Sequence, residues 1–170
     1  ILTCARRKDH YADALRLLHE LVEGDHTRLW PDAYTYNAVL QGSARHGDLT
    51  TARWILADMV RSVMADAHRL RRPNEDTLAH VFWTYAVYQP PIDRHQLSSI
   101  EATQSSDAEG HVAEAAPSPT FTHALPQTSS DVLAEARALM ARILADQGHD
   151  ETAAHPLSSV RVSPRLLHAY

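Results

Sequence analysis

Several residue types and patterns are scarce in this sequence, and each scarcity excludes a class of protein. Cys4 is the single cysteine, so an internal disulfide framework and a metal site built from several cysteines are both excluded. No apolar run approaches the roughly 20 residues that cross a bilayer, and no membrane span is predicted. Only 5 glycines occur, and they form neither a phosphate-binding loop nor a nucleophile elbow.

Histidine, by contrast, is frequent, but its placement gives no support for a metal centre. The 12 histidines are scattered, and no pair is accompanied by a third ligand at a suitable spacing. Together with the missing phosphate loop and nucleophile elbow, this pattern predicts no catalytic residues, no metal and no cofactor. We therefore expect a protein that is not an enzyme.

Charge is distributed unevenly along the chain. The formal net charge is −5, yet residues 1–88 hold 11 Lys and Arg against 11 Asp and Glu. Residues 89–170 hold 5 basic against 10 acidic residues, so the whole deficit lies in the second half. Partners should therefore be judged from each half separately and not from the overall charge.

The stretch from Pro31 to Met59 predicts a helix, a tight turn and a second helix. Asp32 is suited to cap a helix that runs from 33 to 44, because its carboxylate can accept from a free backbone N–H. Gly47 supplies the turn. The second helix carries apolar residues at intervals of three and four, which form one stripe: Ala52, Ile55, Leu56, Met59, Val60 and Val63.

The same pattern occurs on both sides of this hairpin. Residues 14, 18 and 21 of a helix over 11–22 match residues 52, 56 and 59 at an offset of 38 (52 − 14). Pro73-Asn74 repeats Pro31-Asp32 at an offset of 42 (73 − 31) and begins a helix over 75–88, with Asn74 as its cap. Such hairpins bury their stripes against neighbours of the same kind.

A long insertion is predicted after residue 88. Gln89-Pro90-Pro91 stops the helix, and residues 98–130 are rich in Ser, Thr, Ala, Pro and acidic residues, which predicts disorder. Ser130-Asp131 is expected to cap the next helix, which Gly148 ends. Ser163-Pro164 then begins a further helix.

The predicted fold is all-α, an α-solenoid of helix-turn-helix repeats with a long disordered insertion. Residues 1–32 form the C-terminal part of a repeat and residues 33–74 a complete repeat. Residues 75–161 form a repeat interrupted at about 89–130, and residues 162–170 begin another. Because residue 1 is Ile within a helical pattern, we expect the chain to be a piece of a longer protein.

The central hairpin resembles a pentatricopeptide repeat. The resemblance is carried by Pro31-Asp32, by Thr35-Tyr36-Asn37, by Gly47, and by Ala52, Leu56 and Met59. Tetratricopeptide repeats share the architecture but favour Trp and Leu-Gly in the first helix and Ala-Phe in the second. The resemblance implies binding of single-stranded RNA in mitochondria, in the processing, stability or translation of a transcript. The irregular spacing is more similar to fungal or animal members than to plant arrays.

In that family the fifth and last residues of each repeat read one base. The resemblance thus implies Asn37 and Asn74 as the reading pair of the central repeat, associated with cytosine more than uracil. Tyr34 would stack beside the base, Asp32 would belong to the preceding repeat, and His168 would be the fifth residue of the last. Ala79 at the fifth position makes the repeat from residue 75 non-reading.

Structural roles remain open for the same residues. Asn37 can serve only in packing, and Asn74 and Asp32 need nothing beyond capping. Basic residues at helix ends and in loops are either phosphate contacts or part of a solvated surface: Arg6, Arg7, Lys8, Arg69, Arg71 and Arg72.

Two other functions remain as alternatives to RNA binding. The same surface can hold a peptide or another protein, which the neutral charge of residues 1–88 and the acidic insertion favour. The repeats can also act only as spacers. The charge around Asn37 separates the first two, since a basic groove favours RNA and an apolar or acidic groove favours protein.

Overall fold

The computed structural model describes residues 1–7, 10–23, 31–64, 71–91, 124–149 and 155–170. All regular structure in these ranges is helical. The helices are α1 (Leu2–Arg6), α2 (Tyr11–Glu23), α3 (Ala33–His46), α4 (Leu49–Met64), α5 (Glu75–Val87), α7 (Ser129–Asp146) and α8 (Pro164–Ala169). None of the helices described is long and apolar enough to cross a bilayer.

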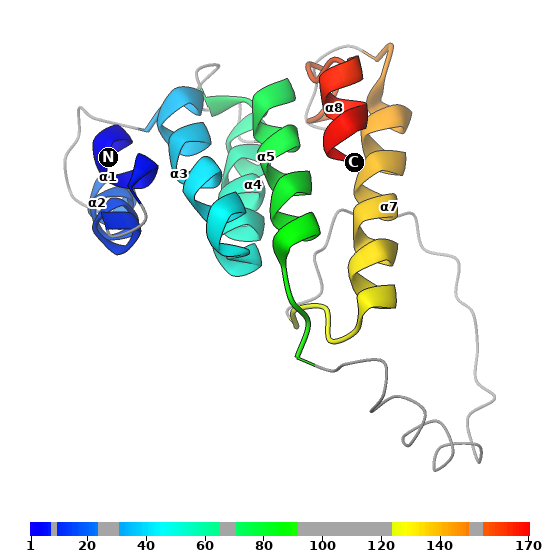
Figure 1. Ribbon diagram of the computed structural model, residues 1–170. Coiled ribbons are helices and arrows are strands. Elements are labelled where there is room, and N and C mark those ends of the chain that lie inside the picture. Colours follow the sequence, from blue (N-terminus) through cyan, green and yellow to red (C-terminus); the bar gives the residue numbers. More distant parts are fainter. Residues whose placement is uncertain (8–9, 24–30, 65–70, 92–123, 150–154) are drawn as a thin grey trace.

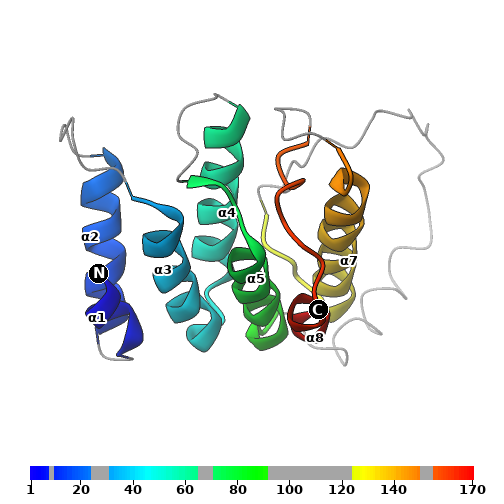
Figure 2. The ribbon, with the colours of Figure 1, turned by 90° about the horizontal axis from the view of Figure 1, so that it is seen from above.

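The helices lie in two layers (Figure 1). Seen from above, α1, α3, α5 and α8 form one row, and α2, α4 and α7 form a second row behind it (Figure 2). Within the first row α3 packs between α1 and α5, and α5 packs between α3 and α8. Helix α4 packs against both α3 and α5, so the chain alternates between the layers as it advances. The predicted all-α class is confirmed for the described residues.

Local capping explains where the central helices begin and end. The Asp32 carboxylate accepts from the backbone N–H of Thr35 at 2.8 Å, as the sequence predicts. Helix α3 ends at Gly47, whose φ of 64° is left-handed and favours glycine. A side chain on Gly47 would also crowd the Val87 carbonyl oxygen, which lies 3.1 Å from the Cβ position. The turn therefore needs glycine for two reasons.

Asn74 and Ser163 cap α5 and α8 as predicted, but the prediction for α7 was wrong. Thr128 is the N-cap of α7, and Ser130 lies inside the helix. The Thr128 hydroxyl accepts from the Asp131 backbone at 3.1 Å, and the Asp131 carboxylate accepts from the Thr128 backbone at 2.9 Å. This reciprocal capping box needs a hydrogen-bonding side chain three positions after the cap: Thr128 has Asp131 there, whereas Ser130 has the apolar Leu133.

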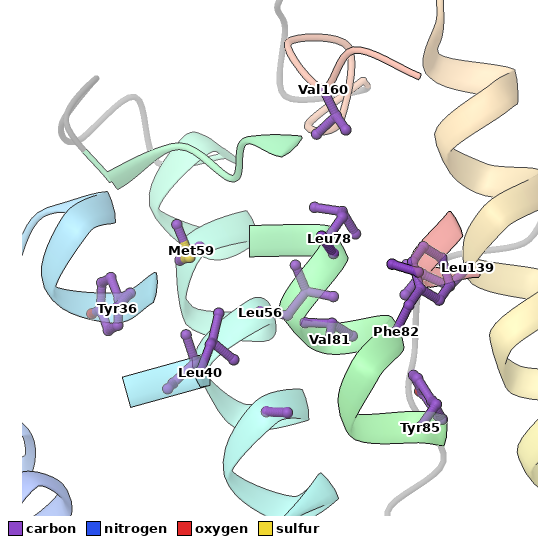
Figure 3. Packing of buried hydrophobic residues seen from close by; sticks show 14 of the residues in the cluster. Tyr36, Leu40, Leu56, Met59, Leu78, Val81, Phe82, Tyr85, Leu139 and Val160 are labelled. Carbon is purple, nitrogen blue, oxygen red and sulfur yellow. The ribbon is translucent and has the colours of Figure 1, made fainter. Parts of the chain in front are cut away.

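A large apolar core lies between the layers (Figure 3), and a small separate cluster is formed by Ala5, Ala14 and Ala38. Of the stripe predicted on the second helix of the central hairpin, Ala52, Ile55, Leu56, Met59 and Val63 are buried, and Val60 is partly buried against the same core. Residues of α3, α5 and α7 complete the core, among them Tyr36, Leu40, Leu78, Val81, Phe82, Tyr85 and Leu139.

Buried tyrosines hold the layers together through carboxylates. Tyr36 of α3 donates its hydroxyl to Asp58 of α4, and Tyr85 of α5 donates to Glu135 of α7 at 3.0 Å. Burial raises the pKa of both phenols well above the usual range, so both stay protonated and remain donors at neutral pH. Each bond thus fixes the register of one helix against a helix of the other layer.

The chain returns to the helices before the predicted end of the insertion. Arg53 of α4 donates to the carbonyl of Ala124 at 3.0 Å, and the Tyr88 hydroxyl donates to the carbonyl of Pro126 at 3.0 Å. Residues 124–130 are therefore ordered, and the prediction of disorder was wrong for them. The remainder of the predicted insertion, residues 92–123, lies outside the described residues.

Candidate functional site

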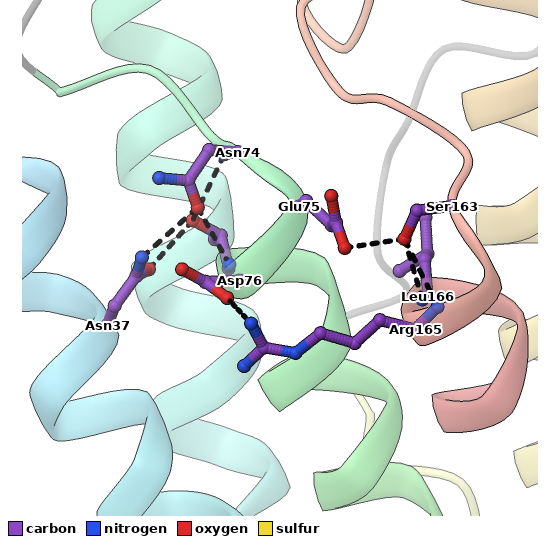
Figure 4. A network of polar contacts seen from close by, with 8 residues as sticks. Asn37, Asn74, Glu75, Asp76, Ser163, Arg165 and Leu166 are labelled. Atoms are coloured by element: carbon purple, nitrogen blue, oxygen red, sulfur yellow. Dashed lines mark hydrogen bonds and ion pairs between the residues drawn. The ribbon is translucent and has the colours of Figure 1, made fainter.

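The two amides of the predicted reading pair meet in the structure. Asn37 lies on α3 and Asn74 is the N-cap of α5, and the Nδ2 of Asn37 donates to the Oδ1 of Asn74 at 3.1 Å (Figure 4). The bond joins residues 37 positions apart in the sequence and is exposed to solvent. The interface between α3 and α5 therefore brings the predicted pair to one place.

A buried hydroxyl, that of Thr77, orients both amides. The Oγ1 of Thr77 lies 2.7 Å from the Oδ1 of Asn37 and 3.0 Å from the Oδ1 of Asn74. The same oxygen accepts from the backbone N–H of Asn74 at 3.1 Å, and the Thr77 N–H donates to Asn74 at 3.0 Å. Because Thr77 has no exposed surface, this network is fixed by the packing of α5.

The network uses the oxygens of the amides and leaves N–H groups for other partners. Both Oδ1 atoms accept hydrogen bonds from within the network. Among the described residues, no acceptor is bonded to the Nδ2 of Asn74. Each Nδ2 carries two N–H groups, and the network occupies one of them, on Asn37. The pair consequently presents hydrogen-bond donors to a ligand.

A depression of about 200 Å³ lies beside this pair, between α3, α5 and α8. Tyr34 lies at its edge with 61% of its surface exposed, so its ring is accessible to a ligand. The residues that line the depression are Tyr34, Asn37, Ala38, Gln41, Asp76, His80 and Arg165.

Charge is balanced in the depression. Arg165 of α8 forms an ion pair with Asp76 of α5, one residue beyond the first position of α5 (Figure 4). Burial lowers the pKa of His80 and outweighs the opposite effect of Asp76, while Arg165 and Arg45 add to the lowering. His80 is thus neutral at pH 7. The groove is neither basic nor acidic, so charge alone does not separate the two predicted partner classes.

The other predicted base-contact residues lie on the same layer of helices. Asp32 caps α3, and its pKa is lowered chiefly by the hydrogen bond from the Thr35 hydroxyl. The Oδ1 of Asp32 accepts both this hydroxyl and the Thr35 backbone N–H. Capping therefore explains Asp32 without a ligand. His168 is exposed on α8, and its ring meets Trp83 of α5 edge-on with the centroids 5.9 Å apart.

Those predicted phosphate contacts whose side chains the structure describes do not line the depression. Arg7 is exposed just after α1. Arg71 is buried, which removes it from the candidates for phosphate contact, and Arg72 is half-buried. Lys8, Arg69 and the side chain of Arg6 lie outside the described residues.

The described residues contain no group of three or more His, Cys, Asp or Glu side chains arranged to hold a metal ion. In the comparisons with known proteins, no family model, no curated protein and no solved structure matched the chain. Function is therefore inferred from the contacts of this chain.

The sequence-based predictions do not identify Thr77, Trp83 and Arg165 as residues of the candidate site or its surroundings. For Thr77 a signal was present, because the spacing Pro-Asx-x-x-Thr occurs at both 31–35 and 73–77. A threonine three positions after a capping residue is suited to a capping box. For Arg165 no signal was available, since its partner Asp76 lies 89 residues earlier (165 − 76).

Proposed function

We propose that this chain binds single-stranded RNA on the layer formed by α1, α3, α5 and α8. The observation that carries the proposal is the contact of Asn37 with Asn74, whose oxygens are occupied and whose N–H groups are available beside the exposed ring of Tyr34. Edge recognition by amides combined with stacking on an aromatic ring is the way in which proteins hold unpaired bases.

The alternation of helices between two layers supports an α-solenoid of the pentatricopeptide type for this segment. In such an array the row of α1, α3, α5 and α8 forms one continuous surface, and each adjacent pair of helices in the row offers one place for a base. By its resemblance the protein acts on a mitochondrial transcript, in its processing, stability or translation. Binding alone is sufficient for that role, and neither catalysis nor a cofactor is part of the proposal.

The donor character of the pair suggests which base it holds. Cytosine presents two adjacent acceptors, N3 and O2, on its Watson–Crick edge. Uracil presents its acceptors, O2 and O4, on either side of an N–H donor. A pair of amides whose oxygens are held by Thr77 offers N–H groups only, which match two adjacent acceptors. We therefore propose cytosine over uracil at this position.

The balanced charge of the groove bears on affinity and on its dependence on salt. Each phosphate neutralised by a protein contributes a slope of about −0.7 for single strands in a plot of log K against log salt. Because Arg165 is paired with Asp76 in the depression, few phosphates can be neutralised there. The proposal thus includes a shallow salt dependence and binding that relies on base contacts.

Fluorescence anisotropy with labelled RNA octamers tests the proposal. We expect oligo-C to bind more tightly than oligo-U, and oligo-A more weakly than either. A double variant with Asn37→Ala and Asn74→Asp should lose the preference, because alanine and aspartate offer no amide N–H while Asp still caps α5. Gln127→Ala, an exposed amide near the start of α7 in the other layer, is the matched control.

A protein partner is the second candidate, because the Asp76–Arg165 ion pair leaves the groove without the net positive charge that would single out RNA. The same titrations separate the two candidates. If none of the octamers binds to the wild type, RNA binding is refuted. Affinity purification of the full protein, with the Asn37→Ala and Asn74→Asp variant as reference, would then identify the protein held on this surface.

A further inference from the structure

We infer that Trp83 and His168 form a second base-binding place, on the surface between α5 and α8, which holds one RNA base by stacking. The inference rests on the proposed function and extends it to the neighbouring nucleotide. It assigns a ligand contact to Trp83, which neither caps a helix nor belongs to the buried core.

Trp83 lies on the same face of α5 as the residues of the depression. Asp76, His80 and Trp83 follow one another at intervals of four and three residues, which places them in one stripe on a helix. His80 and Trp83 are separated by about 4.5 Å along the helix axis. The surface that begins at Tyr34 therefore continues to Trp83 without an intervening element.

The rings of Trp83 and His168 remain available to a ligand. Trp83 is 44% exposed, and the two ring planes are inclined at 66°, so neither ring stacks on the other. Two other aromatic pairs in the described residues are stacked: Tyr11 on His46 with an interplanar angle of 10°, and His149 on His155 at 7°. A base can stack on the indole of Trp83 with His168 at its edge.

The two proposed base-binding places also differ at equivalent positions after the helix caps. Asn37 lies five residues after the cap Asp32, and the equivalent residue of α5, five after Asn74, is Ala79, which is 1% exposed and cannot hydrogen-bond a base. Nine residues after the caps, α3 has Gln41 where α5 has Trp83. The second place thus has an aromatic surface where the first has hydrogen-bonding side chains, and stacking tolerates any base.

Trp83→Ala tests the inference in the same anisotropy titrations. Loss of one stacked base should weaken octamer binding by about 5- to 150-fold. An octamer of ribose phosphate without bases should bind the variant and the wild type equally. Trp83→Phe, which keeps a ring, should lose less than Trp83→Ala. Leu133→Ala is the matched control, since Leu133 is 48% exposed on α7 in the other layer. Thermal melts confirm that each variant is folded.

Tryptophan fluorescence gives a second, independent measurement. A variant with Trp30→Phe and Trp54→Phe keeps Trp83 as its only tryptophan. Its emission should be quenched by the octamer with the midpoint found by anisotropy. An unchanged affinity of Trp83→Ala together with no quenching would overturn the inference and leave the proposed function standing. If Trp83→Ala weakened binding of the base-free octamer to the same extent, the inference would also be overturned. Trp83 would then contact the RNA backbone and not a base. Failure of the wild type to bind any octamer would overturn both.

Discussion

The N-terminal end of α5 contacts its two neighbours by different chemistry. Toward α3 the contact is neutral and consists of the Asn37 and Asn74 amides around the buried Thr77 hydroxyl. Toward α8 it is charged: Glu75 accepts from Ser163, and Asp76 pairs with Arg165, whose side chains are 47% and 63% exposed. The neutral contact is centred on a hydroxyl with no exposed surface, whereas the ion pair lies where water screens it. The first contact should thus fix geometry, and the second should respond to salt.

Phe82→Ala should break both contacts and have the largest effect. Phe82 is 2% exposed in the core, and its ring meets Tyr170 beyond α8 edge-on with the centroids 5.4 Å apart. Removing a buried phenylalanine costs about 3–5 kcal/mol of unfolding free energy. Urea unfolding followed by circular dichroism measures this loss, with Leu133→Ala as an exposed control that should change by less than about 0.5 kcal/mol. A loss below about 1 kcal/mol for Phe82→Ala would contradict the described core.

Thr77→Val should loosen the neutral contact and leave the charged one in place. Valine preserves the shape but removes the hydroxyl that bonds Asn37 and the Asn74 backbone, so buried polar groups lose a partner at a cost of about 1–3 kcal/mol. Urea unfolding gives the total. Amide hydrogen exchange should show faster exchange at the start of α5. Thr77→Ser keeps the hydroxyl and should recover most of the loss; if serine is as damaging as valine, packing and not hydrogen bonding is responsible.

Two substitutions of Asn74 separate capping from recognition. Asn74→Ala removes the cap and should cost about 1 kcal/mol, whereas Asn74→Asp keeps an accepting oxygen and should be nearly neutral. Only the aspartate variant combines an intact helix with a lost amide donor. Its thermal melt should match the wild type while its preference for oligo-C declines. An unchanged preference in this variant would leave Asn74 with a capping role alone.

Arg165→Ala should lower the free energy of unfolding least among these variants, and high salt should abolish the difference from the wild type. Exposed ion pairs contribute about 0.2–1 kcal/mol, and in 1 M salt the screening length falls to about 3 Å. Unfolding at low and at high NaCl should therefore show a small loss that disappears at high salt. The Thr77→Val loss should stay constant across the same series. Equal salt dependence in the two variants would remove the contrast between the contacts.

Much of the fold could be predicted from the sequence because its signals are local. Asp32 and Asn74 were identified as caps, and the stripe from Ala52 to Val63 was identified as core, because both patterns depend on neighbours within a few residues. The start of α7 was misplaced because three consecutive hydroxyl residues compete for the cap. The choice of Thr128 depends on Asp131 three positions later.

The site was predictable only in part, for a related reason. Asn37 and Asn74 could be paired because the resemblance to pentatricopeptide repeats assigns the fifth and last residues of a repeat to one base, and the two amides do meet in the structure. The orientation of their amides could not be predicted, since it depends on the hydroxyl of Thr77, whose burial is a property of the packed helices. The neutral character of the groove likewise depends on Arg165 reaching Asp76 from a helix far along the chain.

The anchors at Ala124 and Pro126 have a consequence for how this protein can change over evolution. Arg53 and Tyr88 hold the returning chain close to the point at which α5 ends, so the segment between them begins and finishes at one place on the helical layers. Closing a loop between fixed ends costs only about 0.6 kcal/mol more for each doubling of its length. Lengthening the connection between these anchors therefore adds little to the entropy cost of joining them. The same place is a natural position for inserting a tag or a reporter domain.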